Sequence, residues 1–223
     1  MEIRTLSWMD VERYLERDDR VVLPLGSTEQ HAYLSLATDS ILAERVSVEA
    51  AEPLGVPVLP ALAYGVTPRF AAYPGSPSVS AETYVALLGD LLASLRGQGF
   101  NRILVVNGHG GNSFAAQHVA GEGVRWHDWW IGPKVRAVVE RIDPAGSHAS
   151  WMENFPWTRL PGIELPAEHK APVDTSAAAE PEELRRVAGD GSFGGWYERP
   201  DEEVLELWRA GVEGVRELLE LGT

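Results

Sequence analysis

Apolar residues along this chain alternate between a helical spacing and short uninterrupted runs that are typical of buried strands. The run VVLPLG at 21–26 predicts a buried strand, and RILVV within 101–108 predicts another. Leucines that recur every three or four residues after Ser80 predict an amphipathic helix. The whole pattern predicts helices at 7–19, 40–55, 80–99, from Ser113 and at 200–222, and extended segments at 21–26, 56–65, 101–108 and 124–132.

Single positions refine the helix ends and the buried faces. Ser7 followed by Asp10 resembles a capping box, and Pro53 with Gly55 ends the second helix. The tract 143–181 is rich in proline and tryptophan, and we assign no elements within it. The residues predicted to face inward are Tyr84, Leu87, Leu88, Leu91, Leu92 and Leu95 in one helix, and Val204, Leu207, Trp208, Val215, Leu218 and Leu219 in the last.

Strands that alternate with helices through short links predict an α/β fold whose mostly parallel sheet is covered by helices on both faces. Ligand sites in such sheets collect at the carboxyl ends of the strands. The length of 223 residues is enough for a sizeable core, and we expect a single domain over 1–223.

Composition and charge exclude several classes of function. With 33 acidic and 19 basic residues the net charge is -14, which disfavours nucleic acid and anionic membrane surfaces as partners. The chain contains no cysteine, so disulfides, thiolate metal sites and thiol nucleophiles are excluded. No signal peptide or membrane-spanning run is evident, and we expect a cytoplasmic protein.

Polar residues follow the ends of two predicted strands. Glu29 and His31 follow the first strand, Asp39 lies just beyond them, and His109 lies in NGHGGN after the strand at 101–108. Imidazole and carboxylate groups together are the usual ligands of zinc, manganese and iron, so these four residues predict a divalent metal site. A bridging carboxylate would allow two ions.

Other interpretations of these residues stay open. Taken singly, Glu29 fits a capping or solvated residue, Asp39 fits a carboxylate at a helix N-terminus, and a lone histidine is usually not a ligand. NGHGGN also fits a phosphate-binding turn, but it lacks lysine and the spacing of the known glycine-rich motifs.

Four segments resemble the creatininase (creatinine amidohydrolase) superfamily. LPLGSTEQHAYLSLATD and NGHGGN are similar to its G-S-x-E-Q-H-G and N-G-H-G-G-N blocks, and the first is followed by the expected aspartate. HASWMEN at 148–154 is similar to its H-A-G-x-x-E-T block, and GDGSFGGWYERP to a glycine-containing segment before the last helix. The resemblance covers most of the chain and implies a three-layer α/β sandwich, commonly assembled as a hexamer.

The resemblance also implies two divalent ions, of zinc, manganese or iron, and a role for each matching residue. It assigns Glu29, His31, Asp39, His109 and Glu153 as metal ligands, with Asp39 bridging. It assigns His148 and Glu153 to catalysis, with His148 assisting proton transfer. We expect Gly110, Gly111, Asn112, Trp151 and Tyr33 to bind substrate, and Trp151 stands where many members of the family have a smaller side chain.

Departures from the family pattern argue against creatinine as the substrate. True creatininases carry a glutamate where this chain has Gly111, and Ala32 and Ser35 replace a usual glycine and proline near the ligands. The resemblance implies a hydrolase that uses a metal-activated water to attack the carbonyl of a small cyclic amide or formamide.

Two alternatives remain. One is hydrolytic C–C ring opening of a cyclic polyol ketone, and the other is a non-catalytic metal-binding or ligand-binding oligomer of the same fold. Glu168, His169 and Asp174 form a second histidine–carboxylate group, which we interpret as a loop at the pocket rim or at a subunit interface.

Overall fold

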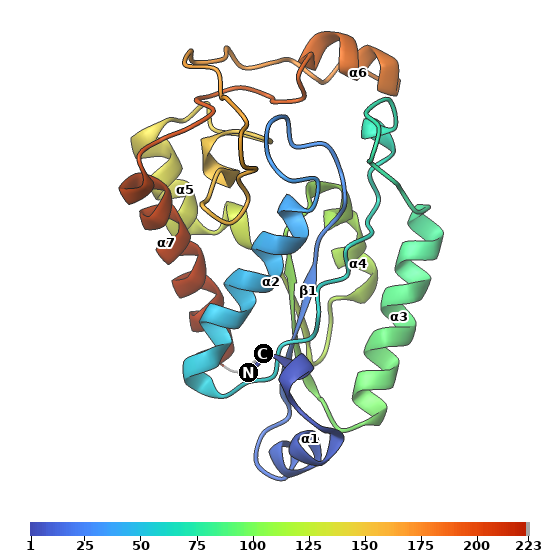
Figure 1. The fold of residues 1–223 in the computed structure, drawn as a ribbon. Coiled ribbons are helices and arrows are strands. Elements are labelled where there is room, and N and C mark those ends of the chain that lie inside the picture. The colour runs from blue at the N-terminus through green and yellow to red at the C-terminus, as the bar shows by residue number, and fades with distance from the viewer. Residues whose placement is uncertain (222–223) are drawn as a thin grey trace.

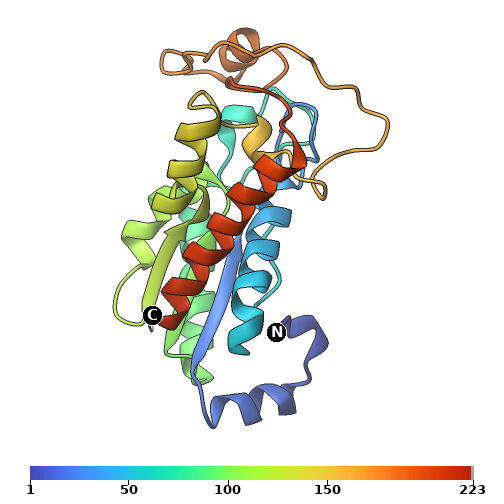
Figure 2. The same ribbon diagram turned by 90° about the vertical axis from the view of Figure 1, so that its left-hand side faces the viewer.

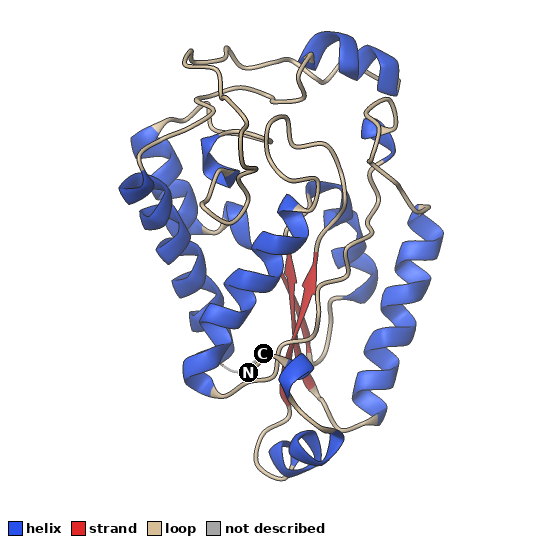
Figure 3. Cartoon of the chain, in the orientation of Figure 1, coloured by secondary structure: helices blue, strands red, loops and turns tan. Residues whose placement is uncertain are grey.

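The computed structural model describes residues 1–221 and shows a central sheet between two layers of helices (Figures 1 and 3). The strands are β1 (Arg20–Leu25), β2 (Arg102–Asn107) and β3 (Val124–Asp128). The α-helices are α1 (Trp8–Leu15), α2 (Thr38–Ala51), α3 (Ala81–Gly97), α4 (Ala116–Val119), α5 (Pro133–Ile142), α6 (Pro181–Ala188) and α7 (Asp201–Glu220). Short 3-10 turns lie at Ile3–Thr5, Glu52–Leu54, Pro68–Phe70, Gly110–Ala115, Trp129–Ile131 and Trp151–Glu153.

The three strands are parallel in the order β1-β2-β3, which confirms the predicted parallel sheet. The extended segment 56–65 runs beside β1 but pairs with it only through isolated bridges, from Val58 to Val22 and from Leu62 to Leu25. Pro57 and Pro60 lie within this segment and lack the backbone N–H that a continuous ladder needs.

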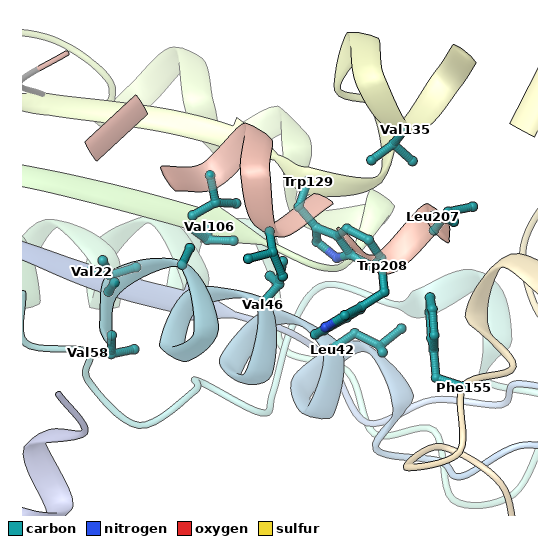
Figure 4. Close-up of a cluster of buried hydrophobic side chains, with 14 of the residues drawn as sticks. Val22, Leu42, Val46, Val58, Val106, Trp129, Val135, Phe155, Leu207 and Trp208 are labelled. Atoms are coloured by element: carbon teal, nitrogen blue, oxygen red, sulfur yellow. The ribbon is translucent and has the colours of Figure 1, made fainter. Parts of the chain in front are cut away.

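Residues of β1 and β2 point alternately to opposite faces of the sheet, and each face has its own hydrophobic cluster. Val22, Leu104 and Val106 pack against α2, α5 and α7, as Figure 4 shows for part of the cluster. Val21, Leu23, Ile103 and Val105 pack against α1 and α3 on the other face. Figure 2 shows α7 running along the sheet on the first of these faces. The three-layer α/β sandwich is therefore confirmed.

Aromatic side chains fill the layer between α2 and α7. The rings of Trp129 and Trp208 meet edge to face at 5.7 Å, and Phe155 stacks on Trp157 at 5.3 Å. Gly211 of α7 faces Trp129 so closely that an added Cβ would lie 2.8 Å from the indole ring. Large aromatic rings in a small volume thus fix the distance between α7 and the sheet.

Several local predictions are confirmed and others are wrong. The capping box of Ser7 and Asp10 is present, but Leu87 in α3 is 40% exposed and does not face the core. The helix expected from Ser113 is a 3-10 turn followed by only one turn of α4. The sequence pattern did not predict α5 or α6, and Gly222 at the end of the last predicted helix lies outside the described residues.

Within residues 1–221, no helix combines the length and the apolar character that crossing a lipid bilayer requires.

Candidate metal centre

The carboxyl ends of β1 and β2 deliver two loops to the same edge of the sheet. Glu29 and His31 follow β1, and His109 follows β2, while Asp39 lies in the first turn of α2. All four side chains are buried, with at most 5% exposure. The structure therefore brings together the four residues that the sequence pattern singled out.

Asp39 lies between the two imidazole rings. One carboxylate oxygen is 3.0 Å from Nε2 of His31, and the other is 2.9 Å from Nδ1 of His109. The hydroxyl of Ser27 donates a hydrogen bond of 2.9 Å to the second oxygen and holds the carboxylate in place. The Asp39 carboxylate thus turns one oxygen toward each histidine.

Two further carboxylates complete groups of three ligand atoms on either side of Asp39. Glu29 Oε1 is 3.3 Å from Nδ1 of His109, and the Thr67 hydroxyl donates a hydrogen bond to its other oxygen. Glu153 Oε2 lies 3.8 Å from Nε2 of His31 and accepts a 2.6 Å hydrogen bond from the backbone N–H of Ala149.

Two potential metal-binding groups share Asp39, and the ligand atoms within each lie within 4.8 Å of one another. They are Glu29, Asp39 and His109, and His31, Asp39 and Glu153. This arrangement offers three ligands to each of two ions, with one carboxylate in common.

Backbone carbonyls orient both histidines toward the carboxylates. Nδ1 of His31 is 3.2 Å from the carbonyl of Glu29, and Nε2 of His109 is 3.0 Å from the carbonyl of Val66. Each carbonyl accepts a hydrogen bond from the ring nitrogen beside it, so the opposite nitrogen faces the centre and, once deprotonated, can offer its lone pair to a metal. Nε2 of His31 is buried and faces carboxylate oxygens of Asp39 and Glu153 at 3.0 and 3.8 Å, but within residues 1–221 it has no partner in the geometry of a hydrogen bond, as expected of a nitrogen that coordinates a metal.

The electrostatics of the centre show an excess of negative charge. Burial by itself lowers the pKa of His31, but Asp39 outweighs burial and raises that pKa to about 10. The pKa of His109 is likewise well above its usual value, because Asp39 and Glu29 outweigh its burial. Burial raises the pKa of Glu153 to about 7. Divalent cations would balance this charge in place of protons, so the residues fit a divalent metal centre.

His148 lies beside the centre in an aromatic cage. Its ring stacks on Phe70 at 4.8 Å, contacts Phe193 at 4.9 Å and lies 4.5 Å from the ring of His31. Nδ1 of His148 is 3.9 Å from Glu29. Burial, together with the neighbouring charge of His31, lowers the pKa of His148 to about 4, so this imidazole is neutral near pH 7.

The loop after β2 approaches other backbone segments too closely for side chains at two of its glycines. A Cβ on Gly108 would lie 2.6 Å from the carbonyl oxygen of Asp39, and a Cβ on Gly111 would overlap the Val66 carbonyl and the His109 ring. The place of the glutamate found in true creatininases is thus filled by the hydrogen-bonded pair of His109 and Val66.

A cavity of about 770 Å³ opens onto the centre. Glu29, Asp39, His109, His148 and Glu153 all line it, together with Gly110 and Gly111. The glycine-rich loop therefore forms part of the wall, as expected of residues that contact a substrate.

Three residues expected to bind substrate are not among those that line this cavity. Trp151 is fully buried in the hydrophobic core, where its ring has no exposed surface to offer a substrate. Asn112 is also fully buried, and its amide donates to the carbonyl of Gly26 at 3.0 Å, which makes it an anchor of the loop. Tyr33 packs edge to face on Tyr197 at 5.5 Å.

The second histidine–carboxylate group of the sequence is not assembled as a site. His169 pairs instead with Asp143 at 3.2 Å, and Asp174 caps its own turn through Ser176. Sequence patterns did not single out Ser27 and Thr67, whose hydroxyls hold the carboxylates of Asp39 and Glu29. Nor did they single out Phe70 and Phe193 around His148. Thr67 and Phe70 lie after the segment 56–65, where no periodic pattern marks them. Phe193 lies between Asp190 and Pro200, where the resemblance to the family is weak.

Comparisons with known proteins agree with this geometry. A family model described as creatininase, creatinine amidohydrolase, matches residues 4–219. A mycofactocin precursor peptide peptidase of Mycolicibacterium smegmatis is 37% identical over 99 residues, which is 41% of this chain and 40% of that protein. A creatinine amidohydrolase of Pseudomonas putida is 30% identical over 115 residues, covering 48% of this chain and 44% of that protein.

A 3-dehydro-scyllo-inosose hydrolase of Thermotoga maritima is 28% identical over 109 residues, or 48% of this chain and 35% of that protein. The chain thus aligns with less than half of the length of each of these relatives. Among solved structures, a creatinine amidohydrolase superposes with a TM-score of 0.78 at 22% identity, over 99% of this chain and 96% of that one. A structure described as creatininase with manganese superposes with a TM-score of 0.78 at 21% identity, over 99% of this chain and 97% of that one. These superpositions establish the shared fold.

Proposed function

The chain belongs to the creatininase family, and from this premise we propose that it is a metal-dependent hydrolase that cleaves an amide-type C–N bond. The observation that carries the proposal is the carboxylate of Asp39, held between two imidazoles at 3.0 and 2.9 Å and shared by two groups of ligand atoms. Of the relatives, one is named a peptidase and another an amidohydrolase, and both names denote cleavage of C–N bonds.

One ion would be held by Glu29 and His109, and the other by His31 and Glu153. Asp39 would contribute to both sites. When bound, two divalent ions lower the pKa of a water molecule and polarise a carbonyl, which prepares a hydrolytic attack. The buried walls of the centre keep bulk water away from these residues and strengthen the charge interactions between them.

His148 is suited to moving a proton between water and the leaving nitrogen. Its imidazole is neutral near pH 7, so Nδ1 can accept a proton and then return it. Gln30 accommodates both tautomers of the ring, because its carbonyl lies 3.1 Å and its side-chain amide 2.8 Å from Nε2. The Phe70 ring fixes the imidazole plane, which leaves Nδ1 toward Glu29.

Removal and restoration of metal tests the proposal. Protein treated with a chelator should lose hydrolysis of a panel of cyclic amides, formamides and short peptides, and should regain it with zinc, manganese or iron. His31→Ala and His109→Ala should lower the bound metal, whereas His118→Ala, on exposed α4, should retain it. Full metal content in both site variants would refute the proposal.

A second candidate function is hydrolytic C–C cleavage of a cyclic polyol ketone. The similarity to the inosose hydrolase of Thermotoga maritima favours it. The same assay decides between the two, because turnover of an inosose-type diketone without turnover of any amide would select C–C cleavage. Bound metal without turnover of any substrate, and without an effect of His148→Ala, would instead support a non-catalytic protein.

A further inference from the structure

The walls of the cavity differ sharply from the metal centre at its base. Away from the ligands, Phe70, Phe193, Trp130 and Met152 line an apolar wall. A volume of about 770 Å³ lies in the range of sites that bury molecules considerably larger than a five-membered lactam. The cavity therefore fits a substrate with an apolar or aromatic body attached to the bond that is cleaved.

One arginine that lines the cavity has no side-chain partner within residues 1–221. Of the 19 lysines and arginines, all but Arg125 and Arg136 make a side-chain ion pair, hydrogen bond or cation–π contact within residues 1–221. Arg136, in the second turn of α5, lines the cavity, and Arg125 of β3 does not. Carboxylates are abundant in a chain with a net charge of -14. A guanidinium that lines a cavity without pairing with one of them is therefore available to bind an anionic ligand.

A second cation that lines the cavity makes no ion pair within residues 1–221. Arg69 lines the same cavity, and its guanidinium donates only to the uncharged carbonyl of Thr175, at 3.0 Å. At the base, three carboxylates would be opposed by the four positive charges of two divalent ions. Glu140 of α5 also lines the cavity, so its charge offsets one of the two arginines and leaves the wall with one net positive charge. The loaded cavity would then carry a net positive charge at its base and on its wall, which attracts anions.

We propose, on the basis of the proposed function, that the substrate is an amide that carries a free carboxylate and an apolar side chain, with Arg136 binding the carboxylate. The planar guanidinium matches a carboxylate through two parallel N–H···O bonds, and Arg136 has both donors available. An N-acylated amino acid or the carboxyl end of a short peptide has this combination of groups.

Calorimetric titration with a matched pair of probes tests the inference without requiring turnover. N-acetyl-L-phenylalanine carries the carboxylate, and N-acetyl-L-phenylalaninamide is its neutral counterpart. The manganese-loaded chain should bind the acid about tenfold more tightly than the amide, as expected of a charge-assisted pair at a partly solvated site. Arg136→Gln should remove this preference, and Arg136→Lys should keep part of it.

Arg125→Gln is the matched control, because it removes an equally unpaired arginine that does not line the cavity. A preference for the acid that persists in Arg136→Gln would assign carboxylate binding to the metals and overturn the inference. Equal binding of both probes to the wild-type chain, or binding of neither, would also overturn it.

The same titration with chelator-treated protein separates this inference from the proposed function. A chain that binds two ions but shows no acid preference refutes only the role of Arg136. A chain that takes up no metal but shows an acid preference dependent on Arg136 refutes only the metal-dependent hydrolase.

Discussion

Addition of a divalent metal to the metal-free protein should release about two protons per chain at pH 8, because ligand nitrogens must be deprotonated to coordinate. His31, with a pKa of about 10, and His109, with a pKa well above its usual value, are both protonated in the metal-free centre at this pH. His148, with a pKa of about 4, is already neutral and contributes none. Glu153, with a pKa of about 7, is mostly ionised at pH 8 and adds roughly half a proton at pH 7.

Titration calorimetry in several buffers measures this number. The observed heat varies linearly with the ionisation enthalpy of the buffer, and the slope gives the protons released. His31→Gln should lower the value by about one, since one imidazolium is removed. The control is His118→Gln, whose ring is exposed on α4 and should leave the slope unchanged. Release of only a few tenths of a proton by the wild-type chain would refute the assignment of both histidines as ligands.

Three other outcomes are expected. In metal-free protein, the raised pKa of His31 contributes stability that is present below pH 6.5 and lost as pH rises toward about 10, so the melting temperature should fall across this window. A melting temperature that rises there would contradict the predicted ion pairs. Gly211→Ala should destabilise by about 1–3 kcal/mol in urea unfolding, because its Cβ would lie 2.8 Å from Trp129. Gly214→Ala in the same helix meets nothing within 4 Å and should stabilise by up to about 1 kcal/mol, so equal effects would disprove the packing argument. Ser7→Ala should cost about 1 kcal/mol by removing the cap of α1, seen as faster amide exchange there, and unchanged exchange would show that the cap contributes little.

The sheet could be predicted from sequence because its strands are buried on both faces. β1 and β2 are continuous apolar runs, and burial on both faces removes any need for polar positions within them. α5 was harder, because PKVRAVVERI has few apolar residues, and only Val135 and Val138 are buried. Its signal was Pro133 at the first helical position.

The candidate ligands could be predicted to lie together because the carboxyl ends of parallel strands meet at one edge. The remainder of the site depends on long-range packing that local patterns do not encode. Trp151 illustrates this limit, since a tryptophan in a loop beside catalytic residues suggests a substrate wall, yet tertiary packing buries it completely. Arg136 could not be singled out either, because its lack of an ionic partner becomes evident only when every other cation has been placed.

The overlap at Gly111 constrains how this family can change its chemistry. A glutamate at this position would displace the Val66 carbonyl, which in turn fixes the tautomer of His109. A single substitution toward the creatininase arrangement would therefore disable a ligand before it supplied a new one. The backbone around residue 66 must shift first, so the order in which such mutations accumulate matters. A glutamate introduced at position 111 alone should therefore impair the site. Replacement of the segments around residues 66 and 111 together should preserve it.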